Sequence, residues 1–314
     1  MSYYDDQYPA YYQDYQGYRT AEPYQGPNLR LLAGIVLAVI SVIIYMTRTE
    51  VNPVTGERQH IAMGVAEEMA LGLQSASEMA AKMGGAIDPN SDDRAREVAL
   101  IGQRLVERSD ARRSPYVRNF SFNLLNDPRT VNAFALPGGP IFITRALYEQ
   151  LPDEAALAGV LGHEIGHVIN RHAAEHMATG QLGQGLTAAF GIGANGSNQG
   201  RNAAIVAAMV NQVTQLKFSR GDESEADQSG LKYMAQAGYD PSAMLQVMEV
   251  LKAASQGGSP PEILATHPLP ESRLVEIRDI LKRDYPDGIP SRLTRGSPLP
   301  GGGGRQRAFG MIGD

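Results

Sequence analysis

Residues 163–167 form the pattern H-E-x-x-H, which constrains the local fold and the chemistry of this chain more than any other segment. Residues four apart lie one above the other on an α-helix, so a helix here presents His163 and His167 to a single metal ion. This pair of ligands is typical of Zn²⁺, and Glu164 then lies close enough to take a proton from a zinc-bound water. The preceding residues 153–162 are rich in Ala and Leu and contain no proline, as the helix requires.

A catalytic zinc site needs a third protein ligand and one open position. In an extended H-E-x-x-H-x-x-G-x-x-H pattern the third His falls six residues after the second, where this chain has Ala173. His172 and His176 lie nearby, but on a continuous helix they are about 140° and 180° from His167 around the axis. We therefore expect both to face away from the metal, as polar residues on the outer or second-layer face of the helix.

A second candidate helix begins near residue 219 and contains the sequence E-S-E-A-D at residues 223–227. Glu223 and Asp227 are four residues apart and share a helix face, whereas Glu225 is rotated about 200° away. A carboxylate from a separate helix completes a His₂Glu zinc site, and an acidic residue one turn later can orient a ligating imidazole. Alone, an acidic cluster at a helix start indicates only a favourable helix dipole, so this interpretation depends on the H-E-x-x-H helix.

Together these segments resemble the zinc metalloendopeptidase family that includes the CAAX prenyl protease and the bacterial heat-shock protease HtpX. The similarity is greatest to its periplasmic and mitochondrial quality-control branch, and it covers roughly residues 59–285. It rests on four motifs in the family's order: N-A-F-A-L-P-G-G at 132–139, L-G-H-E-I-G-H at 161–167, S-R with E-S-E-A-D at 219–227, and T-H-P with an arginine at 266–273.

The resemblance implies an α+β fold that is mostly α-helical, of the zincin-like metallopeptidase (gluzincin) type. A small β-sheet or hairpin would lie beside the H-E-x-x-H helix. It also implies that Glu223 is the third ligand of one Zn²⁺ per chain. Asp227 would then hydrogen-bond the free N–H of a ligating histidine.

Two β-type runs, residues 131–136 and 140–144, are separated by the turn signal P-G-G and predict a hairpin. Pro140 restricts its strand to a sheet edge or to the first position of a strand. In metallopeptidases like those that this chain resembles, an edge strand beside the zinc holds the substrate backbone in extended form. An ordinary core hairpin is the alternative. On the resemblance, we expect three residues to contact substrate: Asn132, Ala133 and Phe134.

Two further candidate catalytic residues lie downstream. Pro268 and Pro270 keep His267 out of a helix interior, and a new helix begins directly after them. A cation here can stabilise the oxyanion of a tetrahedral intermediate, the role that the resemblance favours for Arg273. His267 either provides similar support or caps the open zinc position and holds the enzyme latent.

An apolar run from Leu31 to Met46 extends to residues 29–47 if Arg30 snorkels, which is long enough to cross a bilayer. Residues 1–28 contain eight of the 14 tyrosines and predict a disordered tail. This lead is long and acidic, and no small-residue cleavage site follows the apolar run, so we expect an uncleaved signal anchor. A buried helix of a soluble protein is the alternative. We expect a single-pass protein of a bacterial inner membrane with an extracytoplasmic catalytic domain, although the charged flanks do not decide the orientation.

The rest of the chain divides into a juxtamembrane linker and helix, one zinc metallopeptidase domain and a disordered Pro/Gly-rich tail, at residues 48–90, 91–288 and 289–314. Helical patterns occur within these regions at residues 61–83, 92–109, 203–218, 220–238, 240–254 and from 271 onward. Residues 180–200 contain seven glycines, and we expect a mobile segment near the cleft or a plain linker.

The absence of cysteine excludes a thiol nucleophile and a disulfide, and a net charge of −6 without a basic run argues against nucleic acid. The favoured function is a membrane-anchored zinc endopeptidase that cuts misfolded or membrane-associated polypeptides, with Glu164 as general base. Its expected partners are polypeptide substrates and membrane lipid around residues 29–47. A zinc-bearing chaperone or scaffold, and a membrane adaptor that acts through the Tyr-rich tail with a dormant peptidase site, are the alternatives.

Overall fold

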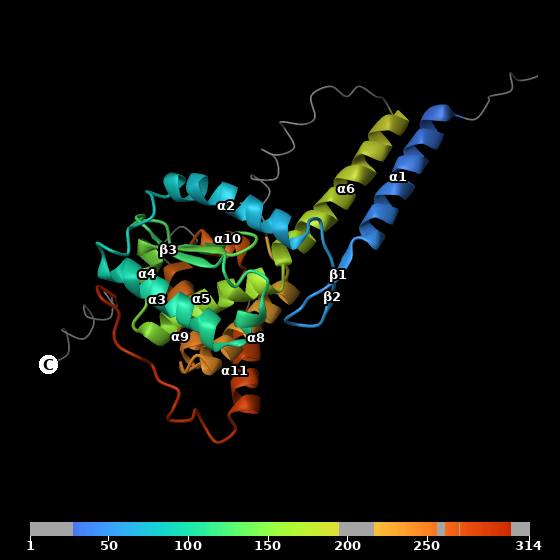
Figure 1. Ribbon diagram of the computed structural model, residues 1–314. Coiled ribbons are helices and arrows are strands. Elements are labelled where there is room, and N and C mark those ends of the chain that lie inside the picture. The colour runs from blue at the N-terminus through green and yellow to red at the C-terminus, as the bar shows by residue number, and fades with distance from the viewer. Residues whose placement is uncertain (1–27, 195–216, 256–260, 270, 303–314) are drawn as a thin grey trace, which may run out of the picture.

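Helix α5 (Glu154–Ile169) carries the H-E-x-x-H motif and forms the centre of the domain (Figure 1). Asp153 caps its start, because the Asp153 carboxylate accepts a hydrogen bond from the backbone N–H of Ala156 (3.0 Å). Every residue of α5 after Glu154 is buried, since other helices and the sheet cover it on all sides. The computed structural model describes residues 28–194, 217–255, 261–269 and 271–302.

Other predicted helices of the domain are present close to the expected positions. Their bounds are α2 (Val65–Lys82), α3 (Asp93–Arg108), α8 (Arg220–Gln236), α9 (Ala243–Ser255) and α11 (Glu271–Asp284). The short helices are η1 (Asp110–Arg113), α4 (Arg145–Tyr148) and α10 (Ile263–Thr266). Most of the helix expected at 203–218, and the Tyr-rich tail, lie outside the described residues.

Glycines bring α5 and α8 unusually close together. A Cβ atom at Gly166 would lie 2.9 Å from the carbonyl oxygen of Ala226, and one at Gly230 would lie 3.0 Å from the backbone nitrogen of His163. Both distances are shorter than ordinary van der Waals contact, so neither position has room for a larger side chain. The short carboxylate side chains of α8 can therefore reach the histidines of α5.

The sheet beside α5 has three strands in the order β3-β5-β4, with bounds β3 (Ser121–Leu125), β4 (Ala133–Ala135) and β5 (Pro140–Thr144). β4 and β5 form the predicted antiparallel hairpin, in which Phe134 pairs with Phe142. Pro140 is the first residue of β5, as its missing N–H requires. β4 is one of the two outer strands, and β3, the other outer strand, which the sequence analysis missed, pairs parallel to β5.

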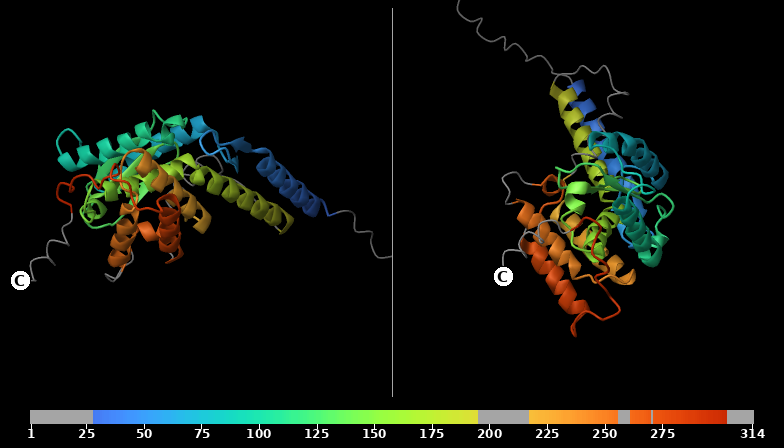
Figure 2. Two further views of the ribbon diagram at one scale, coloured as in Figure 1. Left: turned by 90° about the horizontal axis from the view of Figure 1, so that it is seen from below. Right: turned by 90° about the vertical axis from the view of Figure 1, so that its left-hand side faces the viewer.

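Two helices extend away from the domain side by side, α1 (Leu29–Thr47) and α6 (His172–Ala194), and both figures show this pair (Figures 1 and 2). α1 joins the domain through a small antiparallel hairpin, β1 (Thr49–Val51) and β2 (Arg58–His60). Among the described residues, α1 is the helix that is long and apolar enough to cross a membrane.

The expectation of a mobile segment or linker at residues 180–200 is wrong for the described part, because α6 continues as a helix to Ala194. Glycine lowers intrinsic helix stability, but a packing partner can override that preference. α1 is this partner: a side chain larger than glycine at position 185 would collide with Ser41 of α1.

The expectation of a disordered tail from residue 289 is also wrong as far as residue 302. Leu293 and Leu299 are buried, and backbone bridges join Thr294 to Tyr239 and Pro298 to Asp153. The guanidinium of Arg295 lies 2.8 Å from the Asp153 carboxylate, which also caps α5. Two isolated leucines in a Pro/Gly-rich sequence gave no periodic signal, but their burial, the backbone bridges and the Arg295–Asp153 pair together hold this stretch against the domain.

Candidate metal centre

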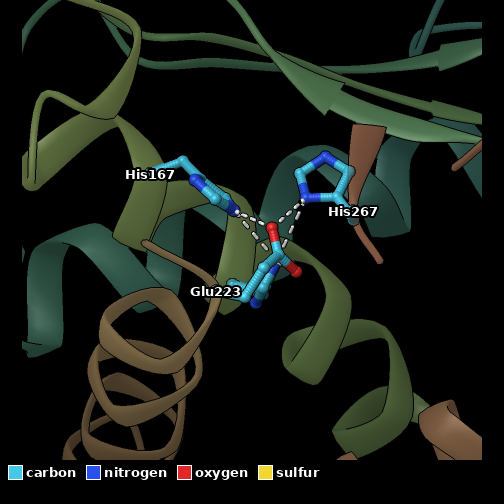
Figure 3. A group of neighbouring side chains, drawn as sticks. His167, Glu223 and His267 are labelled. Atoms are coloured by element: carbon cyan, nitrogen blue, oxygen red, sulfur yellow. Dashed lines mark hydrogen bonds and ion pairs between the residues drawn. The ribbon is translucent and has the colours of Figure 1, made fainter. Parts of the chain in front are cut away.

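Four buried side chains from three parts of the chain converge below the edge of the sheet. His163 and His167 come from α5, Glu223 from α8, and His267 directly follows α10. Their nearest ligand-type atoms all lie within 4.8 Å of one another. Figure 3 shows the carboxylate of Glu223 directed between the rings of His167 and His267.

The spacing of these donor atoms fits a small tetrahedral ion. The Nε2 atoms of His163 and His167 are 3.0 Å apart, and the Glu223 oxygens lie 3.6 and 3.4 Å from them, respectively. Nδ1 of His267 lies 3.0 Å from Glu223 Oε1 and 3.4 Å from His163 Nε2. With bonds of about 2.0–2.1 Å, tetrahedral Zn²⁺ requires donor separations of about 3.3 Å. The residues present therefore fit zinc in both chemistry and size.

Asp227 orients the first histidine. Its Oδ1 atom lies 2.9 Å from Nδ1 of His163, so Nε2 of that ring is directed at the donor cluster. Burial raises the pKa of Asp227, but the hydrogen bond to His163 and the charge of Arg273 outweigh it and hold this pKa below its usual value. The carboxylate is therefore ionised and can accept the imidazole N–H.

Arg273 binds two carboxylates, those of Asp227 and Glu223. It donates to both oxygens of Asp227 at 2.8 and 2.7 Å, and its Nη1 atom lies 2.5 Å from Oε2 of Glu223. Nη1 also donates to the backbone carbonyl of Pro268 (3.1 Å), which ties the His267 segment to α11. The transition-state role expected for Arg273 stays a prediction, while this geometry shows how Arg273 pairs with and positions Glu223 and Asp227.

Glu164 is almost fully buried, and neither of its carboxylate oxygens has a hydrogen-bond partner within the described residues. Nε2 of His267 lies 3.9 Å from Oε1 of Glu164. Burial raises the pKa of Glu164, with partial compensation from the nearby His267 and His163. A buried carboxylate without a partner costs free energy and is typical of a functional site that binds a further molecule.

The contact of His172 with His167 was not expected from the sequence. Its Nδ1 atom lies 2.8 Å from Nδ1 of His167, and its Nε2 atom lies 3.2 Å from Oε2 of Glu225. The expectation assumed one continuous helix, but α5 ends before Arg171, whose φ of +57° reverses the chain before α6 begins. His172 therefore contacts a predicted ligand from the second layer, one of the two positions expected for it, whereas His176 pairs with Asp222 (2.7 Å), away from the donor cluster.

The sequence around Arg171 does not predict this break between α5 and α6, because positive φ is rare for arginine. Arg171 is buried and held from outside its own segment: it donates to Glu68 of α2 and to the carbonyl of Met63, and it pairs with Glu50 of β1 at 2.6 Å. The sequence signal is limited to Asn170, a residue type tolerated at helix C-termini.

A cavity of about 90 Å³ joins Glu164 to the edge strand. Asn132 and Phe134, two of the three expected substrate contacts, line it together with Met79 and Met83 of α2. Ala133, the third, is fully buried in the core on the other face of the sheet, as the alternation of a strand requires. Only its backbone can serve a substrate.

A helix with two histidines four residues apart, an acidic residue on a second helix and a small sheet beside them define a zincin-like metallopeptidase. Residues 92–281 match the model of Peptidase family M48, and the chain belongs to that family. The family and the fold class expected from the sequence are thereby confirmed.

Curated relatives include two bacterial proteins and a mitochondrial one. The beta-barrel assembly-enhancing protease of Escherichia coli K12 is 37% identical over 185 residues, which cover 57% of this chain and 37% of the relative. Its Yersinia pestis counterpart is 32% identical over 255 residues, 79% of this chain and 51% of the relative. The mitochondrial metalloendopeptidase OMA1 of Schizosaccharomyces pombe is 28% identical over 240 residues, 76% and 68% respectively. The chain thus spans about a third to a half of the length of these bacterial relatives.

Proposed function

We propose that this chain is a membrane-anchored zinc endopeptidase that cuts misfolded or membrane-associated polypeptides. The observation that carries this proposal is the buried carboxylate of Glu164, which has no hydrogen-bond partner among the described residues and lies beside a donor cluster of tetrahedral spacing. The names of the relatives, an assembly-enhancing protease and a mitochondrial metalloendopeptidase, support peptide-bond hydrolysis near membranes.

His163, His167 and Glu223 would hold the zinc ion. When bound, the ion supplies positive charge that acidifies a water molecule and polarises the scissile carbonyl. Glu164 takes the proton from that water and passes it to the leaving amine. Asp227 keeps the His163 ring in the ligating tautomer, and Arg273 lowers the pKa of Asp227 and holds both Glu223 and Asp227 in place.

His267 occupies the fourth corner of the donor cluster, which supports the second of its two expected roles. Four protein donors close a zinc site, whereas catalysis needs one position open to water and substrate. We propose that His267 caps this position in the resting protein, and that activity requires its displacement.

The edge strand β4 is the proposed backbone-binding element. A substrate paired with it in extended form places alternate side chains toward the cavity beside Glu164. Met79 and Met83 make the wall of this cavity apolar and adaptable, so apolar side chains of varied shape fit it. The side-chain amide oxygen of Asn132 is buried without a hydrogen-bond partner in the described structure and is available to a substrate N–H.

The anchor is α1. Its large apolar side chains are exposed along most of its length, and one residue of the helix, Gly34, is buried. A soluble core helix of this composition would be covered by protein, so lipid is the environment that fits it. We propose an uncleaved single anchor with the catalytic domain outside the cytoplasm of a bacterial cell.

The test compares Glu164→Gln with a matched control, Glu107→Gln, on the exposed face of α3. Zinc content and cleavage of an unfolded casein are measured for both, in the wild-type chain and in a His267→Ala background that removes the cap. Glu164→Gln should keep its zinc and lose about 10²–10⁴-fold in cleavage rate. Undiminished cleavage overturns the proposal. If the protein binds the unfolded casein but neither wild type nor His267→Ala cleaves it, the result favours the scaffold.

A further inference from the structure

α6 runs along the proposed membrane anchor, not across the surface of the domain. It starts at the domain, where α1 ends, and follows α1 in the opposite direction (Figures 1 and 2). The contact is close: Gly185 faces Ser41 with no room for a Cβ atom, and Gly34, seven residues further out, is buried. The two helices therefore lie beside each other over the same range of distances from the domain.

The facing side of α1 is built from small residues. Gly34, Ala38 and Ser41 repeat at helical spacing and are buried or half-buried, whereas Ile35, Val36, Val39 and Ile40 between them are exposed. Without a hydrophobic driving force in lipid, helices associate through small residues that permit close backbone approach. The other side of α1 carries Ile35, Val39 and Ile43, each about half exposed, which suits contact with acyl chains.

The chemistry of α6 suits the same environment. It contains no charged residue from Met177 to Ala194. The hydroxyls of its two exposed threonines are satisfied within the helix, because Thr179 donates to the carbonyl of Glu175 (3.1 Å) and Thr187 to that of Gly183 (2.8 Å). Ser41 of α1 does the same toward Leu37 (2.9 Å). Polar groups satisfied inside their own helix are the kind that hydrocarbon tolerates.

Composition alone does not identify α6 as a membrane element. Gln181 and Gln184 lower the mean hydropathy of α6, and its apolar run, residues 186–192, is too short to span a bilayer. Uncharged amides are nevertheless found in membrane helices that have a partner helix. The packing of α6 against α1 is therefore the observation that supports a membrane position for α6.

We infer that residues 178–194 of α6 insert into the bilayer beside α1, with lipid acyl chains as the partner of this surface. The inference rests on the proposed anchoring by α1. Residues 178–194 extend about 25 Å, close to the roughly 30 Å thickness of the hydrocarbon layer. His172 precedes residue 178 by about 9 Å along the helix, so the metal centre lies close to the membrane surface. The substrates that reach it there are polypeptide segments at or just outside the bilayer.

The absence of cysteine from the chain allows single labels without background. Three full-length variants are reconstituted in phosphatidylcholine vesicles and labelled with an environment-sensitive fluorophore: Thr187→Cys in α6, Val39→Cys in α1 and Leu100→Cys in α3. Val39 and Leu100 are matched in exposure, 50% and 52%. Quenching by lipids that carry a nitroxide on the acyl chain is then compared.

Labels at positions 187 and 39 should be quenched to a similar degree, several-fold more than the label at position 100. If position 39 is quenched and position 187 behaves like position 100, α6 lies outside the bilayer and the inference fails while the anchor stands. If neither is quenched, the anchor itself is wrong and the inference falls with it. Circular dichroism and zinc content, measured on each labelled variant, confirm that all three are folded.

Discussion

Nδ1 of His267 lies 3.0 Å from Oε1 of Glu223, although 44 residues separate them in the chain. This contact brings a loop histidine into the site of a residue expected to bind zinc. Arg273 stabilises this contact, because it pairs with Glu223 and also donates to the carbonyl of Pro268, next to His267. Arg273 thus links the capping residue His267 to Glu223, the expected zinc ligand beside it.

Replacement of His267 by Ala should raise the rate of casein cleavage, because it opens the fourth zinc position to water. Zinc content should stay near one per chain, since three ligands remain. The measurement is the initial cleavage rate at equal zinc loading. A rate that falls about 10²-fold or more at unchanged zinc content would instead assign His267 to support of the transition state.

Glu223→Ala should lose most of the bound zinc, because it removes the one carboxylate of the donor cluster in the described structure and leaves the charge of Arg273 uncompensated beside the three histidines. Glu225→Ala, on the same helix but directed at His172, is the matched control and should retain about one zinc per chain at saturation. Metal analysis after dialysis measures both. Full retention by Glu223→Ala would move the third ligand elsewhere, with Asp222 and Glu225 as the next candidates.

His172→Phe should weaken zinc binding about 10–100-fold, because the hydrogen bond to Nδ1 of His167 orients that ligand. His176→Phe is the control, since His176 lies one turn further along α6 and pairs with Asp222 outside the donor cluster. Competition with a chromophoric chelator at fixed pH gives both affinities. Equal affinities for the two variants would show that the His167–His172 contact is merely structural.

Local signals identified the parts of the site that lie on regular helices. The spacing of His163 and His167 and that of Glu223 and Asp227 each define one helix face, and both faces are found in contact. The contact of His172 with His167 was not predicted, because the direction of His172 depends on Arg171, whose strained backbone is held by Glu68, about a hundred residues earlier. No local pattern contains that information.

The two incorrect fold expectations have the same cause. The glycine-rich part of α6 is helical because α1 packs against it, and the C-terminal stretch is held because Leu299 joins the apolar core and Arg295 pairs with Asp153. In α6 the distant partner overrides a low helix propensity, whereas in the C-terminal stretch it holds an irregular backbone against the domain. Periodicity within a segment cannot reveal such a partner.

Asp92 should contribute stability that depends on pH. Its carboxylate caps α3 by accepting from the backbone N–H of Arg94 (2.8 Å), and the side chain of Arg94 lowers its pKa from 3.8 to about 2. Because the folded pKa lies below the unfolded one, the contribution is complete above about pH 4 and is lost as the pH falls toward 2. Asp92→Ala should lower the free energy of unfolding by about 1 kcal/mol at pH 7.

Urea unfolding of the detergent-solubilised chain between pH 7 and pH 2 measures this effect as the difference from wild type at each pH. Asp93→Ala is the control, since the neighbouring Asp93 side chain is exposed and binds only Arg96 on the helix surface. A difference for Asp92→Ala that stays constant down to pH 2 would show that the carboxylate charge has no part in the cap.

The catalytic domain should lie outside the cytoplasm, with the anchor uncleaved and the N-terminal tail inside. The reasons are one apolar helix long enough to cross a membrane among the described residues, and relatives whose names place them at β-barrel assembly or in mitochondria. Arg30 before the anchor and Arg48 after it balance each other, so the positive-inside rule gives no preference. Protease added to intact spheroplasts should therefore degrade the exposed parts of the domain and leave short protected fragments, one of which contains α1. A domain that resists until the membrane is lysed would place the metal centre in the cytoplasm and reverse the proposed orientation.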